Sequence, residues 1–94
     1  MSSPAITEIL ARLVSFDTTS RNSNLALVRW VEDYLAGFGI RAEIIPDETG
    51  EKANLYATIG PASVPGYILS GHTDVVPVDG QAWSSDPFTL AERE

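Results

Sequence analysis

His72 is the only histidine in the 94-residue chain, and Asp74 follows it two residues later. If the backbone is extended here, both side chains leave the same face, because side chains alternate along a strand. An imidazole whose second nitrogen donates to a carboxylate is a common arrangement at metal ions, since the carboxylate fixes the tautomer and the ring orientation. The pair therefore predicts a metal ligand, His72, with Asp74 behind it. The alternative for so short a pattern is a surface histidine beside a turn aspartate.

One histidine does not complete a metal site, because a catalytic zinc ion normally takes three protein ligands. Asp79, Asp86 and Glu92 lie downstream, but their spacing does not distinguish them from solvated loop carboxylates. The chain has no cysteine, which excludes disulfides and thiolate ligands. A serine nucleophile is not supported either, because no base lies near a serine in the sequence.

Two helices are predicted ahead of this pair. Apolar residues recur at helical spacing over residues 4–16 and again over about 24–36. Ser3 is the expected N-cap of the first helix. Gly37 and Gly39 are the expected source of the left-handed residue that ends the second.

For several polar and aromatic side chains near these helices, we expect a structural role rather than a functional one. Asp17, Thr18 and Thr19 are expected to cap and turn the chain, although they could also meet the loop that carries His72. Trp30 and Tyr34 are four residues apart on one helix face, which predicts a packing pair rather than a ligand site.

The hydrophobic period changes after the second helix. Residues 40–44 alternate between apolar and charged, which predicts a half-buried strand. Residues 54–59 are predicted to form a second strand, and residues 66–71 are typical of a buried one. The segment after residue 71 is rich in proline and glycine and predicts a functional loop. The order of elements predicts an α/β fold, with two N-terminal helices followed by strands of a mixed sheet. We also expect the chain to be truncated, because no predicted element is left to cover that sheet.

Composition narrows the classes of function. The formal net charge is −7, and the basic residues are scattered, which argues against a nucleic-acid partner. No apolar run approaches the roughly 20 residues that cross a bilayer, and the N-terminus lacks the pattern of a signal peptide. We therefore expect no membrane partner and a cytoplasmic location.

The longer motif around His72 resembles that of a known family. It runs Ser70-Gly71-His72-Thr73-Asp74-Val75-Val76-Pro77-Val78-Asp79-Gly80, and Trp83 and Asp86-Pro87-Phe88 follow it. This segment resembles the histidine-aspartate motif of the metallopeptidase family that contains acetylornithine deacetylase, succinyl-diaminopimelate desuccinylase, aminoacylase and related carboxypeptidases. The S-F-D-T-T-S segment at 15–20 and the N-L-Y-A segment at 54–57 extend the similarity. Within the family, these segments most resemble the acetylornithine deacetylases.

The resemblance implies specific roles and a larger protein. It implies that His72 ligates one of two zinc ions, with cobalt as a possible replacement, and that Asp74 is the catalytic-site carboxylate behind it. It implies hydrolysis of an N-acyl amino acid, the deacetylation of N-acetylornithine in arginine biosynthesis, by a homodimeric parent enzyme. Residues 1–94 would then be the N-terminal part of the zinc-peptidase-like catalytic domain. The remaining metal ligands, the general-base glutamate and the dimerisation domain would be missing, so the chain alone is predicted to be inactive.

Two other functions compete with this one. The parent could be another member of the family, such as a succinyl-diaminopimelate desuccinylase or a dipeptidase. Alternatively, the chain could be a stand-alone interaction domain without catalytic activity.

Overall fold

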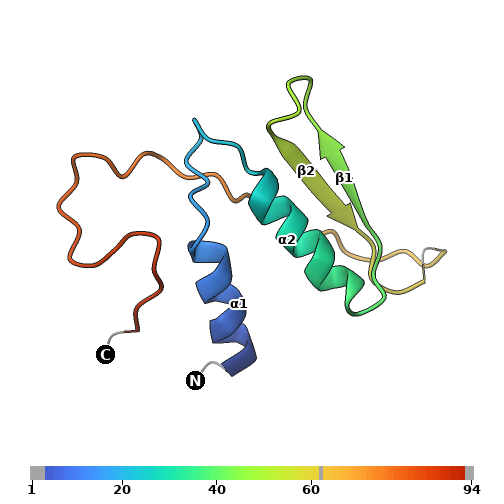
Figure 1. Cartoon of the computed structure of the whole chain (residues 1–94). Coiled ribbons are helices and arrows are strands. Elements are labelled where there is room, and N and C mark those ends of the chain that lie inside the picture. Colours follow the sequence, from blue (N-terminus) through green and yellow to red (C-terminus); the bar gives the residue numbers. More distant parts are fainter. Residues whose placement is uncertain (1–3, 62, 93–94) are drawn as a thin grey trace.

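The structure, a computed structural model, describes residues 4–61 and 63–92. The elements are α1 (Pro4–Val14), α2 (Leu25–Ala36), β1 (Ala42–Pro46) and β2 (Ala53–Ala57), in that order. Figure 1 shows α2 lying along the two-stranded sheet, and the coil after β2 crossing the loop between α1 and α2 before it runs away from the sheet. The predicted α/β class, with two helices followed by strands, is confirmed.

The two helices end close to where the sequence predicts. Helix α1 covers 11 residues and α2 covers 12, and neither helix of the described part is long and apolar enough to span a membrane. The predicted cap Ser3 lies outside the described residues. At the end of α2, Gly37 stays in the right-handed region, whereas Gly39 has φ +74° and takes the left-handed turn. Only one of the two candidate glycines is therefore the left-handed residue.

The sheet is an antiparallel hairpin rather than the mixed sheet that was predicted. Ala42 pairs with Ala57, Ile44 with Leu55, and Pro46 with Ala53. Ala42 and Ile44 on β1 and Leu55 on β2 are half-buried, and α2 packs against both strands. The alternation follows the strand period, so one face of the hairpin meets α2 and the other meets solvent.

The predicted third strand is wrong. Residues 66–71 form neither a helix nor a strand. Tyr67, Ile68 and Leu69 are 100%, 81% and 96% exposed. A strand needs a neighbour to satisfy its backbone groups, and no described segment pairs with these residues, so an apolar run alone does not form one.

The core is small. Its buried apolar residues are Leu27 and Val28 of α2 and Ala53 of β2, and the buried polar residues are Thr18 and Thr19. The core therefore lies between the start of α2, the start of β2 and the loop that follows α1.

Candidate metal-ligand pair

His72 and Asp74 contact each other as the sequence predicts. The distance from His72 Nδ1 to Asp74 Oδ1 is 3.0 Å. With the proton on Nδ1, the ring donates to the carboxylate, and Nε2 is left with a lone pair. Nε2 has no partner among the described residues, and the His72 side chain is 83% exposed. The geometry is that of an imidazole held through one nitrogen and open to a ligand at the other.

The loop between α1 and α2 holds the backbone around Asp74. Thr19 and Val75 form an isolated parallel bridge. Ser20 N donates to the Val75 carbonyl at 3.0 Å, and Val75 N donates to the Thr18 carbonyl at 3.2 Å. Thr18 Oγ1 also donates to the Thr73 carbonyl at 2.6 Å. Three links across about 55 residues of sequence therefore fix the segment that follows His72.

The loop has its own internal support. Asp17 Oδ1 accepts hydrogen bonds from both Thr19 N at 3.1 Å and Thr19 Oγ1 at 2.6 Å. These bonds lower the pKa of Asp17 below its ordinary value, with the Thr19 hydroxyl as the main cause. Thr19 itself is 1% exposed, so its hydroxyl is buried with its acceptor supplied. The predicted turn role is confirmed for Asp17 and Thr19. Thr18 and Thr19 also contact the loop that carries His72.

Asp74 is the centre of the cluster. Its Oδ2 accepts a hydrogen bond from Ser20 Oγ at 2.8 Å, while Oδ1 faces His72. The pKa of Asp74 is lowered, first by the Ser20 hydroxyl and then by His72. Both hydrogen bonds favour the ionised carboxylate, which accepts through its two oxygens.

Ser20 is the site residue that sequence reasoning missed. No base stands near it in the sequence, yet the fold places its hydroxyl on Asp74. This hydroxyl donates to a carboxylate and not to His72, so it is not arranged as an activated nucleophile. In the sequence, only the family resemblance of the whole S-F-D-T-T-S segment pointed to this region. Ser20 itself gave no signal, because its contact with Asp74 depends on the pairing of two loops that are far apart in the sequence.

The other carboxylates of the segment do not join His72. Asp79 pairs with Arg21, with Oδ1 and Nη2 3.1 Å apart, and Asp86 accepts the backbone N–H of Phe88 at 2.9 Å. Within residues 4–61 and 63–92, no group of three histidine, cysteine, aspartate or glutamate side chains is placed to hold a metal ion. His72 and Asp74 thus fit one ligand and its supporting carboxylate, and further ligands would have to come from outside the described residues.

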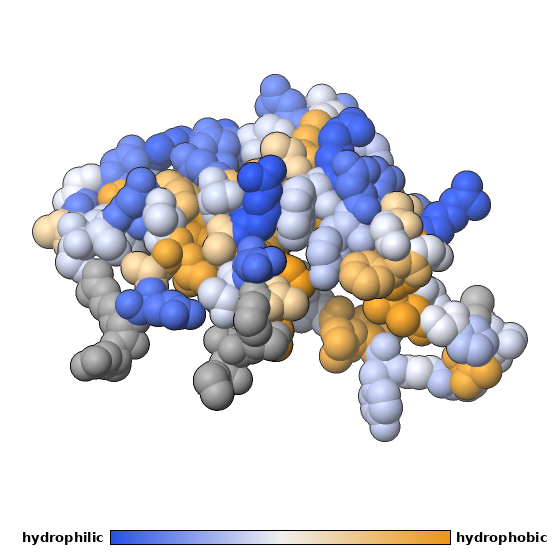
Figure 2. All heavy atoms as spheres, turned by 60° about the horizontal axis from the view of Figure 1, so that its bottom comes forward, coloured by the Kyte–Doolittle hydropathy of each residue, from blue (hydrophilic) through white to orange (hydrophobic). Residues whose placement is uncertain are grey.

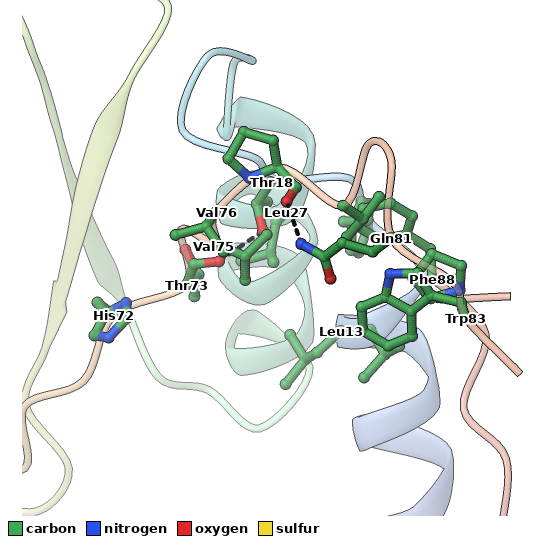
Figure 3. Close-up of a pocket in the computed structure, with 15 residues that line it drawn as sticks. Leu13, Thr18, Leu27, His72, Thr73, Val75, Val76, Gln81, Trp83 and Phe88 are labelled. Carbon is green, nitrogen blue, oxygen red and sulfur yellow. Dashed lines mark hydrogen bonds between the residues drawn. The ribbon is translucent and has the colours of Figure 1, made fainter. Parts of the chain in front are cut away.

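An apolar groove of about 420 Å³ begins beside the pair. Trp83 and Phe88 line it together with Leu13 of α1, and Figure 3 shows these three at the end of the groove away from His72. The Gln81 side chain crosses back to the Pro77 carbonyl at 3.1 Å and holds the C-terminal coil in a loop. Trp83 is half exposed, so it is only partly packed against the body of the molecule.

The chain is similar to several curated acetylornithine deacetylases. It is 44% identical to an acetylornithine deacetylase of Proteus mirabilis over 79 residues, which are 83% of this chain and 20% of that protein. It is 36% identical to the acetylornithine deacetylase of Pasteurella multocida, over 97% of this chain and 25% of the relative. The chain is related to the acetylornithine deacetylases. The resemblance predicted from the sequence is confirmed at this level.

The match covers most of this chain but only a small part of each relative. The acetylornithine deacetylase of Photorhabdus laumondii, 39% identical, matches 96% of this chain but only 22% of its own length. The chain thus spans about a fifth to a quarter of the length of the curated acetylornithine deacetylases that it matches. No family model matches the chain, and no solved structure matches it.

Proposed function

We propose that this chain supplies the His72–Asp74 half of a metal site in a protein that hydrolyses the amide bond of N-acetylornithine. The observation that supports the proposal most directly is the 3.0 Å contact between His72 Nδ1 and Asp74 Oδ1, in a chain related to acetylornithine deacetylases. The proposal includes the zinc ions, replaceable by cobalt, the role in arginine biosynthesis, the cytoplasmic location and the homodimeric parent that the family resemblance implies.

In this proposal, His72, Asp74 and the loop that precedes α2 have different roles. His72 would hold the metal through Nε2, and Asp74 would keep the proton on Nδ1 and so favour this tautomer of the ring. A bound divalent metal would supply Lewis acidity toward the amide carbonyl and lower the pKa of a water molecule. The loop formed by residues 17–21 keeps Asp74 in place through Ser20 and the Val75 backbone.

The similarity of this chain to acetylornithine deacetylases favours N-acetylornithine over the other substrates of the family. The proteins named above are all acetylornithine deacetylases. The stand-alone interaction domain remains the competing function, and it predicts that His72 is dispensable for any metal-dependent hydrolysis.

A segment exchange tests the proposed role of His72. The 79 matched residues of the Proteus mirabilis enzyme are replaced by those of this chain, and hydrolysis of N-acetylornithine is measured with Zn²⁺ or Co²⁺. We expect a hybrid that is active and that loses at least about 100-fold in kcat/KM on His72→Ala, because removal of a ligand disables the metal site. Ser15→Ala is the matched control, since the Ser15 hydroxyl bonds the Arg12 carbonyl and no other group among the described residues. A soluble, active hybrid that tolerates His72→Ala would refute the role.

The 94-residue chain assayed alone provides a second prediction. With Zn²⁺ or Co²⁺ and N-acetylornithine, we expect no turnover above the metal blank, because the described residues do not assemble three ligands. Turnover that disappears on His72→Ala would contradict this expectation.

A further inference from the structure

Ser20 links the loop after α1 to the carboxylate that faces His72. Its Oγ lies 2.8 Å from Asp74 Oδ2, and the other carboxylate oxygen lies 3.0 Å from His72 Nδ1. We propose that Ser20 is a positioning residue: by holding Oδ2, it orients the Asp74 carboxylate so that Oδ1 keeps the imidazole proton on Nδ1 and leaves Nε2 free to bind a metal ion. The inference deepens the proposed function and rests on it for the use made of Nε2.

The exposure of the pair is the reason that positioning matters. The side chains of His72 and Asp74 are 83% and 58% exposed, so water competes for both carboxylate oxygens and for both ring nitrogens. A single hydrogen bond between exposed groups has little net free energy, because water replaces it readily. A carboxylate held at both oxygens rotates less freely. The conformation in which Asp74 Oδ1 faces His72 Nδ1 is then populated for more of the time.

Hydrogen bonds of the Ser20 backbone hold this residue in place without using its hydroxyl. Ser20 N donates to the Val75 carbonyl at 3.0 Å, and Val75 N donates to the Thr18 carbonyl at 3.2 Å. Ser20 therefore sits beside the residue that directly follows Asp74. The Lys52 ammonium donates to the Ser20 carbonyl at 2.7 Å and holds the same residue from the side of the hairpin. None of these contacts uses the Ser20 hydroxyl, so a Ser20 variant is expected to change the carboxylate without displacing the loop.

His72 is a convenient reporter, because it is the only histidine and gives a single pair of ring nitrogens. The tautomer is read from the ¹⁵N resonances of the ring in the 94-residue chain at alkaline pH. For the wild-type chain, we expect one nitrogen with the shift of a protonated site, Nδ1, and one with the shift of an unprotonated site, Nε2. For Ser20→Ala, we expect both shifts to move toward the average of two exchanging tautomers. Ser20→Thr retains the hydroxyl and is expected to restore the wild-type shifts.

Two further variants separate positioning from a general effect on structure. Ser15→Ala removes an exposed hydroxyl that bonds the Arg12 carbonyl, and it should leave the ring shifts unchanged. Asp74→Ala removes the carboxylate while the Ser20 backbone contacts remain, and it should move the ring shifts at least as far as Ser20→Ala does. Because Ser20 acts through Asp74, Ser20→Ala should add no change in the Asp74→Ala background. The backbone amide spectrum checks that each variant keeps its hairpin.

The result that overturns the inference is an unchanged pair of ring shifts in Ser20→Ala. An equal displacement of the shifts by Ser20→Ala with and without Asp74 would also overturn it. The measurement contains neither metal nor substrate, so failure here leaves the hydrolysis test unaffected. An inactive hybrid enzyme, in turn, leaves the tautomer result standing.

Discussion

Asp47 shows how one side chain organises the turn between β1 and β2. Its Oδ1 accepts hydrogen bonds from Thr49 Oγ1 at 2.7 Å, Gly50 N at 2.9 Å and Thr49 N at 3.1 Å. The pKa of Asp47 is lowered, with the Thr49 hydroxyl as the largest cause. The ionised form is therefore favoured by folding, since the unfolded chain offers no such set of donors.

The sign of the resulting pH dependence follows from the lowered pKa. Above the unfolded value of about 3.9, the stabilisation is fully present, and it is lost as the pH falls through the lower folded value. We expect Asp47→Asn to reduce the free energy of unfolding near neutral pH and to flatten its decline below about pH 4. Denaturant unfolding of both chains across this range measures the difference.

Glu48 provides the matched control for Asp47. It is the next residue, it is exposed, and it accepts no hydrogen bond in the described part of the chain. Glu48→Gln should leave the pH profile close to that of the wild-type chain. Equal slopes for Asp47→Asn and the wild-type chain would contradict the role of the turn.

The candidate site could be predicted only in part from the sequence. The contact between His72 and Asp74 follows from their spacing, because side chains two residues apart lie on the same face of an extended backbone. Ser20 could not be predicted, since its contact needs a loop more than 50 residues away and leaves no periodic signal in the chain. The metal-ligand role of His72 stays a prediction.

At the scale of elements, Asn24 joins α2 to β2. Its Nδ2 donates to the Ala53 carbonyl and its Oδ1 accepts from Ala53 N, both at 2.9 Å. Asn24 stands at the N-cap of α2 but makes no capping bond with its side chain, because both polar atoms are used on the strand. Ser23 Oγ instead accepts the N–H of Leu25 at 3.2 Å.

Loss of this amide should weaken the attachment of the hairpin. We expect Asn24→Ala to reduce the free energy of unfolding by about 1–3 kcal/mol, because it leaves both backbone groups of buried Ala53 without their partners. Asn54→Ala, on the exposed face of β2, should change stability by less than about 0.5 kcal/mol. Urea unfolding followed by circular dichroism compares them, and equal losses for the two variants would refute the link.

The elements were predictable to different degrees. Both helices follow from apolar residues at helical spacing, and the hairpin follows from alternation, which are local signals. Residues 66–71 carry the same kind of local signal and form no strand, because pairing depends on a neighbour and not on the segment itself. The packing of Trp30 on Tyr34 was predictable, and the rings lie 5.4 Å apart in a stacked arrangement.

At the scale of the whole molecule, much apolar surface faces solvent. Figure 2 shows apolar side chains in several patches on one face, between polar and charged residues. Tyr67, Ile68 and Leu69 are the most exposed of the large apolar residues described, and Phe38 and Ile59 are largely exposed as well. Exposed apolar surface of this kind favours association, despite the net charge of −7.

Association of the isolated chain is therefore expected to depend on concentration. Light scattering should show species larger than the monomer, and the double substitution Ile68→Asp and Leu69→Asp should shift the distribution toward the monomer. Glu43→Asp, a control on the exposed face of β1, should not change it. A sharp monomer peak for the wild-type chain, with cooperative unfolding, would favour the stand-alone domain instead.

The bridge between Thr19 and Val75 has a consequence for the order in which the molecule forms. The hairpin needs a turn of only a few residues, whereas this bridge must close about 55 residues of chain before its first hydrogen bond is made. Contacts of such long sequence separation form late, and they open more easily than the local structure around them. The amide protons of Ser20 and Val75 should consequently exchange with solvent faster than those of the hairpin. The hydrogen bonds by which the loop after α1 holds Asp74 and Val75 would then form only in the last step of folding.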